Sequence, residues 1–176
     1  MAAIEEQRAK RPVSTLAGPY GHPFHPIAVT VPIGAWVCAF VFDLVSLGSD
    51  QPDVWATGAR WLIGIGVIGA LVAAVLGFLD LVTIPNGTTA QRTALTHMAL
   101  NVTVLVLFVV SFFLRSGRTD EQTSVGLLLL SIVALALLGA SGWLGGKLAY
   151  HFGVRVADES TQAEGFLRAH QPGDRG

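Results

Sequence analysis

The sequence predicts an all-α integral membrane protein, a bundle of four antiparallel helices with both termini on the cytoplasmic side. The first observation is a set of four long apolar runs, each at least as long as the roughly 20 residues that cross a bilayer core as a helix. The second is the composition, because 13% of the 176 residues are charged, whereas a water-soluble domain has about a quarter. The predicted helices cover residues 27–48, 61–84, 93–114 and 123–146.

The distribution of lysine and arginine is the third observation, and it predicts the orientation. Four crossings place both termini and the middle loop on one side, which has eight of these residues against three on the other. Two of the eight, Arg168 and Arg175, lie far from the membrane, which leaves six against three. Loops rich in lysine and arginine stay in the cytoplasm. We therefore expect a multi-pass protein of the bacterial inner membrane, in contact with the lipid bilayer, with its termini inside.

One membrane domain accounts for the length of the chain. We expect residues 1–20 to form a cytoplasmic N-terminal segment, residues 21–156 to form the transmembrane domain, and residues 157–176 to form a flexible cytoplasmic tail without regular structure. The N-terminal segment lacks the apolar stretch of a cleavable signal peptide, so the first helix is expected to direct insertion. No internal repeat is evident between the two pairs of helices.

Single residues predict local features of the helices. Pro32 lies one to two turns into the first helix, where it should bend the chain and weaken the bond to the carbonyl of Ala28. Asp43, near the outer end of that helix, should pair with Arg60 or Arg115. Small residues let helices approach closely in lipid, and two stripes of them are present. They are Gly69, Ala73 and Gly77 on the second helix, and Gly142 and Gly146 on the fourth.

Polar side chains gather near the cytoplasmic ends of the predicted helices. Asp80 and His97 each lie about 6 Å inside a helix end, at a rise of 1.5 Å per residue, and Asn101 shares a helix face with His97. Polar groups inside a membrane are costly, so such a cluster is a candidate functional site. We expect Asp80 and His97 to contact each other, directly or through one water molecule, in a polar cluster of Asp80, His97 and Asn101.

Three segments of the chain resemble the signatures of a known family. They are His22-Pro-Phe-His25-Pro at the entry to the first helix, Arg92-Thr-Ala-Leu-Thr-His97-Met-Ala-Leu-Asn101, and Gly142-Trp-Leu-Gly-Gly-Lys-Leu-Ala-Tyr150-His-Phe-Gly153. The chain is similar, over about residues 20–156, to the bacterial four-helix membrane proteins of domain of unknown function 2231. Some members look fused to a Rieske-type iron–sulfur domain, which implies redox chemistry at the membrane and an iron–sulfur protein as one candidate partner.

The chain also departs from the pattern of that family. Relatives often have a histidine at the position of Thr30, an acidic residue at Lys147, and a histidine near position 152. This chain has Phe152 there, with His151 one position earlier. Each departure removes one potential ligand of a metal or cofactor.

The function predicted from these residues is that of a small accessory or structural subunit of a redox or proton-handling membrane assembly. An alternative uses the same histidines as ligands. A b-type haem, the candidate cofactor, would take its axial ligands from His25, His97 and His151. A transition-metal ion would use His22, His25, Asp80 and His97. Since no GxSxG, Walker or HExxH motif is present, the sequence predicts no enzyme, and a net charge of −1 does not favour nucleic acid as a partner.

Overall fold

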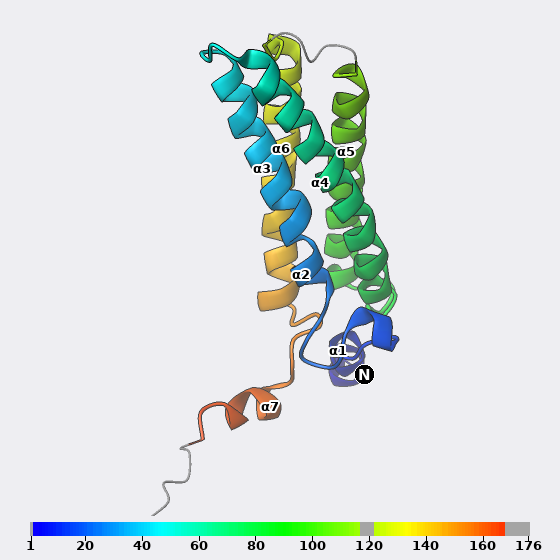
Figure 1. Ribbon diagram of the computed structural model, residues 1–176. Helices are drawn as coiled ribbons and strands as arrows, with labels where there is room; N and C mark the ends of the chain where they lie inside the picture. Colours follow the sequence, from blue (N-terminus) through cyan, green and yellow to red (C-terminus); the bar gives the residue numbers. More distant parts are fainter. Residues whose placement is uncertain (1, 117–121, 168–176) are drawn as a thin grey trace, which may run out of the picture.

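The structure, a computed structural model, describes residues 2–116 and 122–167 of the chain. Four long helices dominate it: α3 (Thr30–Ser46), α4 (Pro52–Leu81), α5 (Thr89–Leu114) and α6 (Val125–Tyr150), shown in Figure 1. The shorter elements are α1 (Ala2–Lys10), η1 (Thr15–Ala17), α2 (His25–Ala28) and α7 (Glu159–Glu164). Within the described residues there is no strand. The predicted all-α bundle of four apolar helices is therefore confirmed.

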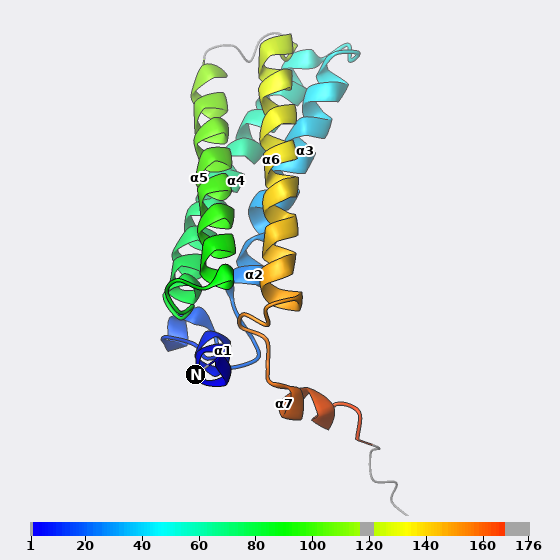
Figure 2. The same cartoon turned by 180° about the vertical axis from the view of Figure 1, so that it is seen from behind.

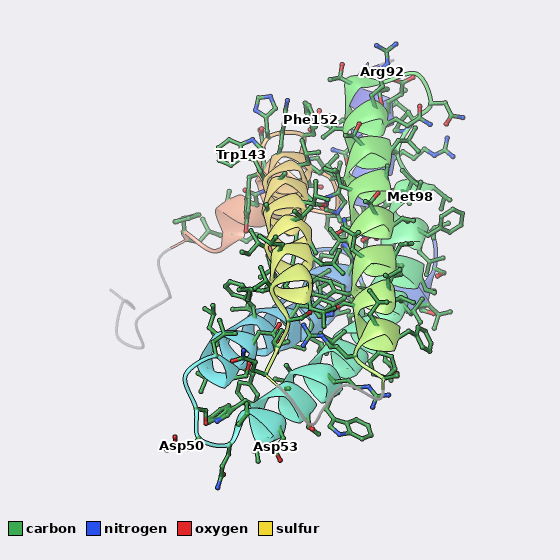
Figure 3. The ribbon with its side chains drawn as sticks, turned by 90° about the horizontal axis from the view of Figure 1, so that it is seen from above. Asp50, Asp53, Arg92, Met98, Trp143 and Phe152 are labelled. Atoms are coloured by element: carbon green, nitrogen blue, oxygen red, sulfur yellow. The ribbon has the colours of Figure 1, made fainter. Side chains whose placement is uncertain are left out.

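The four long helices stand side by side and are joined at alternating ends of the bundle (Figures 1 and 2). We call the end that holds α1, the 82–88 connection and α7 the terminal end, and the other end the loop end. Figure 3 shows Arg92 and Phe152 at the terminal end, and Asp50 and Asp53 at the loop end. Most contacts join α3 to α4 and α5 to α6. The bundle therefore consists of a first hairpin (α2–α4) and a second hairpin (α5–α6).

Three helices extend beyond the apolar runs that predict them. Helix α4 begins at Pro52, nine residues before the predicted start, because a proline suits the first helical turn and the helix continues through Arg60 outside the apolar run. Helix α6 ends at Tyr150 rather than at residue 146. Helix α5 begins earlier too, since the Thr88 side chain accepts a hydrogen bond from the backbone N–H of Gln91 at 3.1 Å.

The first membrane-spanning segment is interrupted where the proline predicts a bend. Helix α2 ends at Ala28, and α3 starts at Thr30 after a turn residue. Pro32 has no N–H to donate to the Ala28 carbonyl. The Thr30 hydroxyl donates instead to the neighbouring carbonyl of Ile27 at 2.7 Å. The short helix α2 can therefore take a direction of its own, and it holds His25 against α4.

The residues in the interior of the bundle are smaller and more polar than those on its outer surface. The fully buried side chains include four serines, Ser46, Ser111, Ser131 and Ser141. The outward-facing positions are rich in exposed valine, leucine and isoleucine. All four helices are long and apolar enough to cross a membrane, counting α2 and α3 as one span. Such a surface is suited to lipid, while small interior residues allow close helix contact.

An aromatic stack occupies the middle of the bundle. Trp36 of α3 and Phe108 of α5 stack with ring centroids 4.2 Å apart and an interplanar angle of 13°. The indole N–H of Trp36 donates to the carbonyl of Ile63 at 3.3 Å. Trp36 and Phe108 are 2% and 1% exposed. The stack therefore joins the two hairpins across one diagonal of the bundle.

A buried ion pair joins the hairpins at the loop end. Arg115 donates from Nη1 and Nη2 to the two carboxylate oxygens of Asp43, at 2.6 and 2.7 Å. The Thr123 hydroxyl donates to Asp43 at 2.8 Å, and Arg115 Nε donates to Ser111 at 3.2 Å. Asp43 is fully buried and Arg115 is 3% exposed. The pairing of Asp43 with Arg115, one of its two predicted partners, is confirmed.

The segment after residue 156 differs in part from the expected unstructured tail, because it contains helix α7. Asp158 caps this helix by accepting hydrogen bonds from the backbone N–H of Thr161 at 3.0 Å and from the Ser160 hydroxyl at 2.8 Å. These bonds hold the pKa of the Asp158 carboxyl below its ordinary value. The rest of the predicted tail, residues 168–176 with Arg168 and Arg175, lies outside the described residues, as does Arg118.

Removing one partner of the loop-end ion pair should destabilise the bundle. We expect Asp43→Ala to lower the free energy of unfolding by about 3–5 kcal/mol, because it leaves Arg115 buried without a counter-charge. The double variant Asp43→Ala, Arg115→Met should lose less, since neither charge remains. Unfolding in mixed micelles measures both, with the exposed Asp53→Ala as control. A single variant as stable as the parent protein would contradict this account.

Candidate functional site

His25 is held against the backbone of α4. Its Nδ1 lies 2.9 Å from the carbonyl oxygen of Ala73. A carbonyl can only accept a hydrogen bond, so Nδ1 carries the proton and donates. The ring reaches this carbonyl because the residue one turn further along α4 is Gly77, where an added Cβ would lie 2.9 Å from His25 Cε1. The small stripe predicted on the second helix is therefore a packing face, and the imidazole occupies it.

His97 is held against α6 in the same way. Its Nδ1 lies 2.8 Å from the carbonyl oxygen of Ser141 and 2.9 Å from the Ser141 hydroxyl. A Cβ added at Gly145, one turn further along α6, would lie 3.1 Å from His97 Cε1. Asn101 Nδ2 donates to the carbonyl of His97 at 2.9 Å and lies 3.1 Å from its Nε2. His97 and Asn101 therefore form a polar contact, as their shared helix face predicts.

The two imidazoles meet between the hairpins at the terminal end. Their ring centroids are 6.4 Å apart and their planes are nearly perpendicular, at 87°. Because each Nδ1 donates to a carbonyl, each neutral ring presents an Nε2 lone pair. In His97 this lone pair faces the Asn101 amide, whereas no hydrogen bond is formed by Nε2 of His25 in the described part of the chain. The pair can therefore accept a proton or bind a metal centre.

The direct contact predicted between Asp80 and His97 is not formed. Asp80 Oδ1 lies 2.7 Å from Nε of Arg155, and no hydrogen bond or ion pair joins Asp80 to His97 in the structure. The expectation of a direct contact was wrong because the chain after α6 folds back and brings Arg155 to the carboxylate. Asp80 is buried, at 9% exposed, as expected.

Arg155 closes the terminal end of the bundle. Its Nη2 donates to the carbonyl oxygens of Ala17 and Gly18 at 2.9 and 3.0 Å, and its backbone N–H donates to Ala9 at 3.0 Å. Its φ angle is +60°, in the left-handed region that non-glycine residues rarely adopt. One side chain thus ties α4 to the N-terminal segment and to the chain that follows α6. This role is structural.

The other predicted ligands do not join the histidine pair. His22 and His151 are exposed, and the ring of His151 packs beside Phe152 with centroids 4.9 Å apart. In residues 2–116 and 122–167, no three histidine, cysteine, aspartate or glutamate side chains come together as a metal site. The proposed ligand sets therefore reduce, in this structure, to the two residues His25 and His97.

Sequence reasoning missed the residues that hold the second histidine. The stripe predicted from Gly142 and Gly146 is not the packing face of α6, since an added Cβ at either position meets nothing within 4 Å. The face is formed by Ser141 and Gly145 instead. A small residue followed by glycine at i+4 was the available signal, because Ala73 and Gly77 show the same spacing on the second helix.

The two glycines beside the imidazoles should tolerate no side chain. We expect Gly145→Ala and Gly77→Ala to lower the free energy of unfolding by about 1–3 kcal/mol, because the methyl group pushes a fixed ring away from its carbonyl. The matched control is Gly146→Ala, which adjoins Gly145 and has open space. Thermal unfolding in detergent compares the three. A Gly145→Ala protein as stable as Gly146→Ala would show that the imidazole does not depend on this contact.

Comparison with known proteins agrees with the resemblance seen in the motifs. No match was found among curated proteins or among solved structures. Residues 21–158, which include the whole bundle and both histidines, match the family described as Predicted membrane protein (DUF2231). This match covers well over half of the chain, and the four long apolar helices agree with its description. The chain therefore belongs to the DUF2231 family of predicted membrane proteins.

Proposed function

We propose that the protein is an accessory subunit of a redox or proton-handling assembly in the bacterial inner membrane, and that the His25–His97 pair is its working site. The observation that supports this proposal is the pair itself. Two imidazoles are held in fixed orientations between the hairpins, at a depth where a merely structural contact would need no ionisable group. Intramembrane histidines are common parts of proton relays and cofactor sites.

The two buried carboxylates fit this role less well than the histidines. Asp43 accepts hydrogen bonds from Arg115 and Thr123, and Asp80 is paired with Arg155. A carboxylate that is paired with a buried arginine fixes the register of its helices and does not exchange protons readily. The imidazole Nε2 atoms, by contrast, retain lone pairs that can take up a proton or a ligand.

The accessory role can be tested in native membranes with the double variant His25→Gln, His97→Gln. Glutamine can still donate to the Ala73 and Ser141 carbonyls, so the variant should fold and assemble with the partners that the parent chain retains in mild detergent. We expect its assembly to lose electron-transfer or proton-transfer activity, measured in vesicles. Replacement of the exposed His151 is the control. Full activity in the double variant would contradict the assignment of the working site.

A b-type haem or a transition-metal ion at the same histidines is the second candidate function. The observation that favours it is the hydrogen bond from each Nδ1 to a backbone carbonyl, which is the usual support of a metal-ligating histidine. An optical spectrum of the purified protein tests it. An absorption band in the Soret region that shifts on reduction would indicate haem, and metal analysis would detect a bound ion. A colourless protein without metal would exclude both.

The proposed orientation places the histidine pair on the cytoplasmic side. It is supported by the excess of lysine and arginine on the side of the termini. Reporter fusions at Gly87 and Gly176 should therefore be active only as cytoplasmic reporters, and fusions at Gln51 and Arg118 only as periplasmic ones. A C-terminal fusion that reports the periplasm would move the site to the other face of the membrane.

A further inference from the structure

The two hairpins repeat the same local arrangement. In the first, a histidine near the start of one helix donates to the carbonyl of Ala73 on the next, beside a glycine four residues on. In the second, the histidine donates to the carbonyl of Ser141, again beside a glycine four residues on. The histidines are 72 positions apart (25 and 97), and the carbonyls and glycines are 68 apart (73 and 141, 77 and 145).

The same spacing continues along both pairs of helices. Along α2–α3 and α5, three pairs of residues in contact are 72 positions apart: His25 with His97, Trp36 with Phe108, and Asp43 with Arg115, which directly follows α5. On α4 and α6, buried residues recur 68 positions apart: Ala59 and Leu127, Ile63 and Ser131, Gly66 and Ala134, Ala73 and Ser141, Asp80 and Leu148. The two hairpins thus present the same faces to each other.

Parallel packing accounts for only part of this repetition. Helices α3 and α5 run in the same direction, so their contacts keep a constant register in any bundle of this kind. Parallel packing does not require a histidine at both ends of that register, nor a small residue with glycine at i+4 on both partner helices. We infer that the second hairpin repeats the first about an approximate twofold axis along the bundle, and that His25 and His97 are equivalent halves of one site.

The chemistry of the two imidazoles limits the kind of ligand that the site can bind. Two imidazoles bound on opposite sides of one metal would have ring centres roughly 6 Å apart, since metal–nitrogen distances are about 2.0–2.1 Å, and the observed separation is 6.4 Å. No third side chain of the described residues completes a metal site. A bare Zn²⁺ ion needs about four ligands, so a centre that brings its remaining ligands with it fits the pair better than such an ion.

An iron porphyrin meets this requirement. We propose, resting on the proposed function, that the site takes one haem whose iron is bound by Nε2 of His25 and of His97 alone. The macrocycle supplies the four other ligands. Its plane would cross the line between the imidazoles, so its edges would face the other diagonal of the bundle, α4 and α6. The residues there are small at this level: Ala73, Gly77, Ser141 and Gly145.

Asn101 distinguishes the two halves. Its amide lies 3.1 Å from Nε2 of His97, and the equivalent position in the first hairpin, 72 residues earlier, is Val29. Haem binding requires the amide to leave this nitrogen. The amide can keep its hydrogen bond to the His97 carbonyl when it does so. The variant Asn101→Val gives the second hairpin the side chain that the first has at Val29. It also removes the amide that competes with haem for Nε2 of His97.

The test is a titration of the purified full chain with haem in detergent, followed by its Soret absorption and by the EPR spectrum of the oxidised complex. His25→Gln and His97→Gln should each lower the affinity by at least about tenfold, and the double variant should lose little more than either alone. His22→Gln and His151→Gln should bind as the parent does, and Asn101→Val at least as tightly. Perpendicular axial imidazoles should give a highly anisotropic low-spin EPR signal.

The outcomes separate this inference from the proposed function. Haem binding that needs His97 and His151 but not His25 would overturn the inference and retain a haem protein. If the His25–His97 pair binds Cu⁺ ions but not haem, the proposal of a haem ligand is overturned and the transition-metal candidate is retained. If neither haem nor Cu⁺ binds, the pair is not a ligand site. The accessory role is then tested by the vesicle experiment alone. Variants whose helical content by circular dichroism differs from that of the parent are replaced by His25→Asn and His97→Asn.

Discussion

A histidine side chain that reaches a helix backbone from outside depends on the residue one turn beyond the carbonyl. That carbonyl already accepts the bond that closes the helix, and a side chain at i+4 would cover it. Glycine at 77 and at 145 leaves it open. The hydrogen bonds from His25 and His97 then join each pair of neighbouring helices at the terminal end. In lipid, where apolar surfaces gain little from meeting each other, such polar contacts and small-residue faces decide which helices pack.

The buried charges are likewise paired within the protein. Each of the two carboxylates inside the bundle has an arginine partner, at 2.6 Å for Asp43 and 2.7 Å for Asp80. The desolvation of such a pair offsets much of its attraction, so its main effect is to fix register. Asp43 fixes the two hairpins against each other at the loop end. Asp80 fixes α4 against the terminal segments through Arg155.

The sequence was sufficient for the four long helices but not for every helix boundary or contact. Apolar run length predicted all four long helices, because the bilayer thickness sets that length, and Pro32 predicted the break before α3. The starts of α4 and α5 were missed, since a helix can continue past the apolar run into polar residues. Asp80 was assigned to His97 because both lie at one depth. Its partner, Arg155, is brought there by a chain reversal after α6 that no periodicity encodes.

Of the predicted polar cluster, the structure brings together His97 and Asn101, whereas Asp80 pairs with Arg155. His25, predicted only as a ligand of a haem or metal, lies beside His97. The equivalence of the hairpins is not visible in the sequence because few residue identities recur, whereas residue size and burial do recur, as at Ala73 and Ser141. Positions that only need to be small can exchange alanine, serine and glycine, so a comparison of letters does not detect them.

The division of contacts explains why a site should lie between the hairpins. Each hairpin has extensive internal packing, and contacts between the hairpins are fewer. Inserting a group between them therefore disturbs the weaker interface and leaves each hairpin intact. The ion pair of Asp43 and Arg115 and the stack of Trp36 on Phe108 hold that interface at the loop end and in the middle. At the terminal end the ion pair of Asp80 with Arg155 adds a further link, and the two imidazoles are the side chains between the hairpins that a ligand would engage.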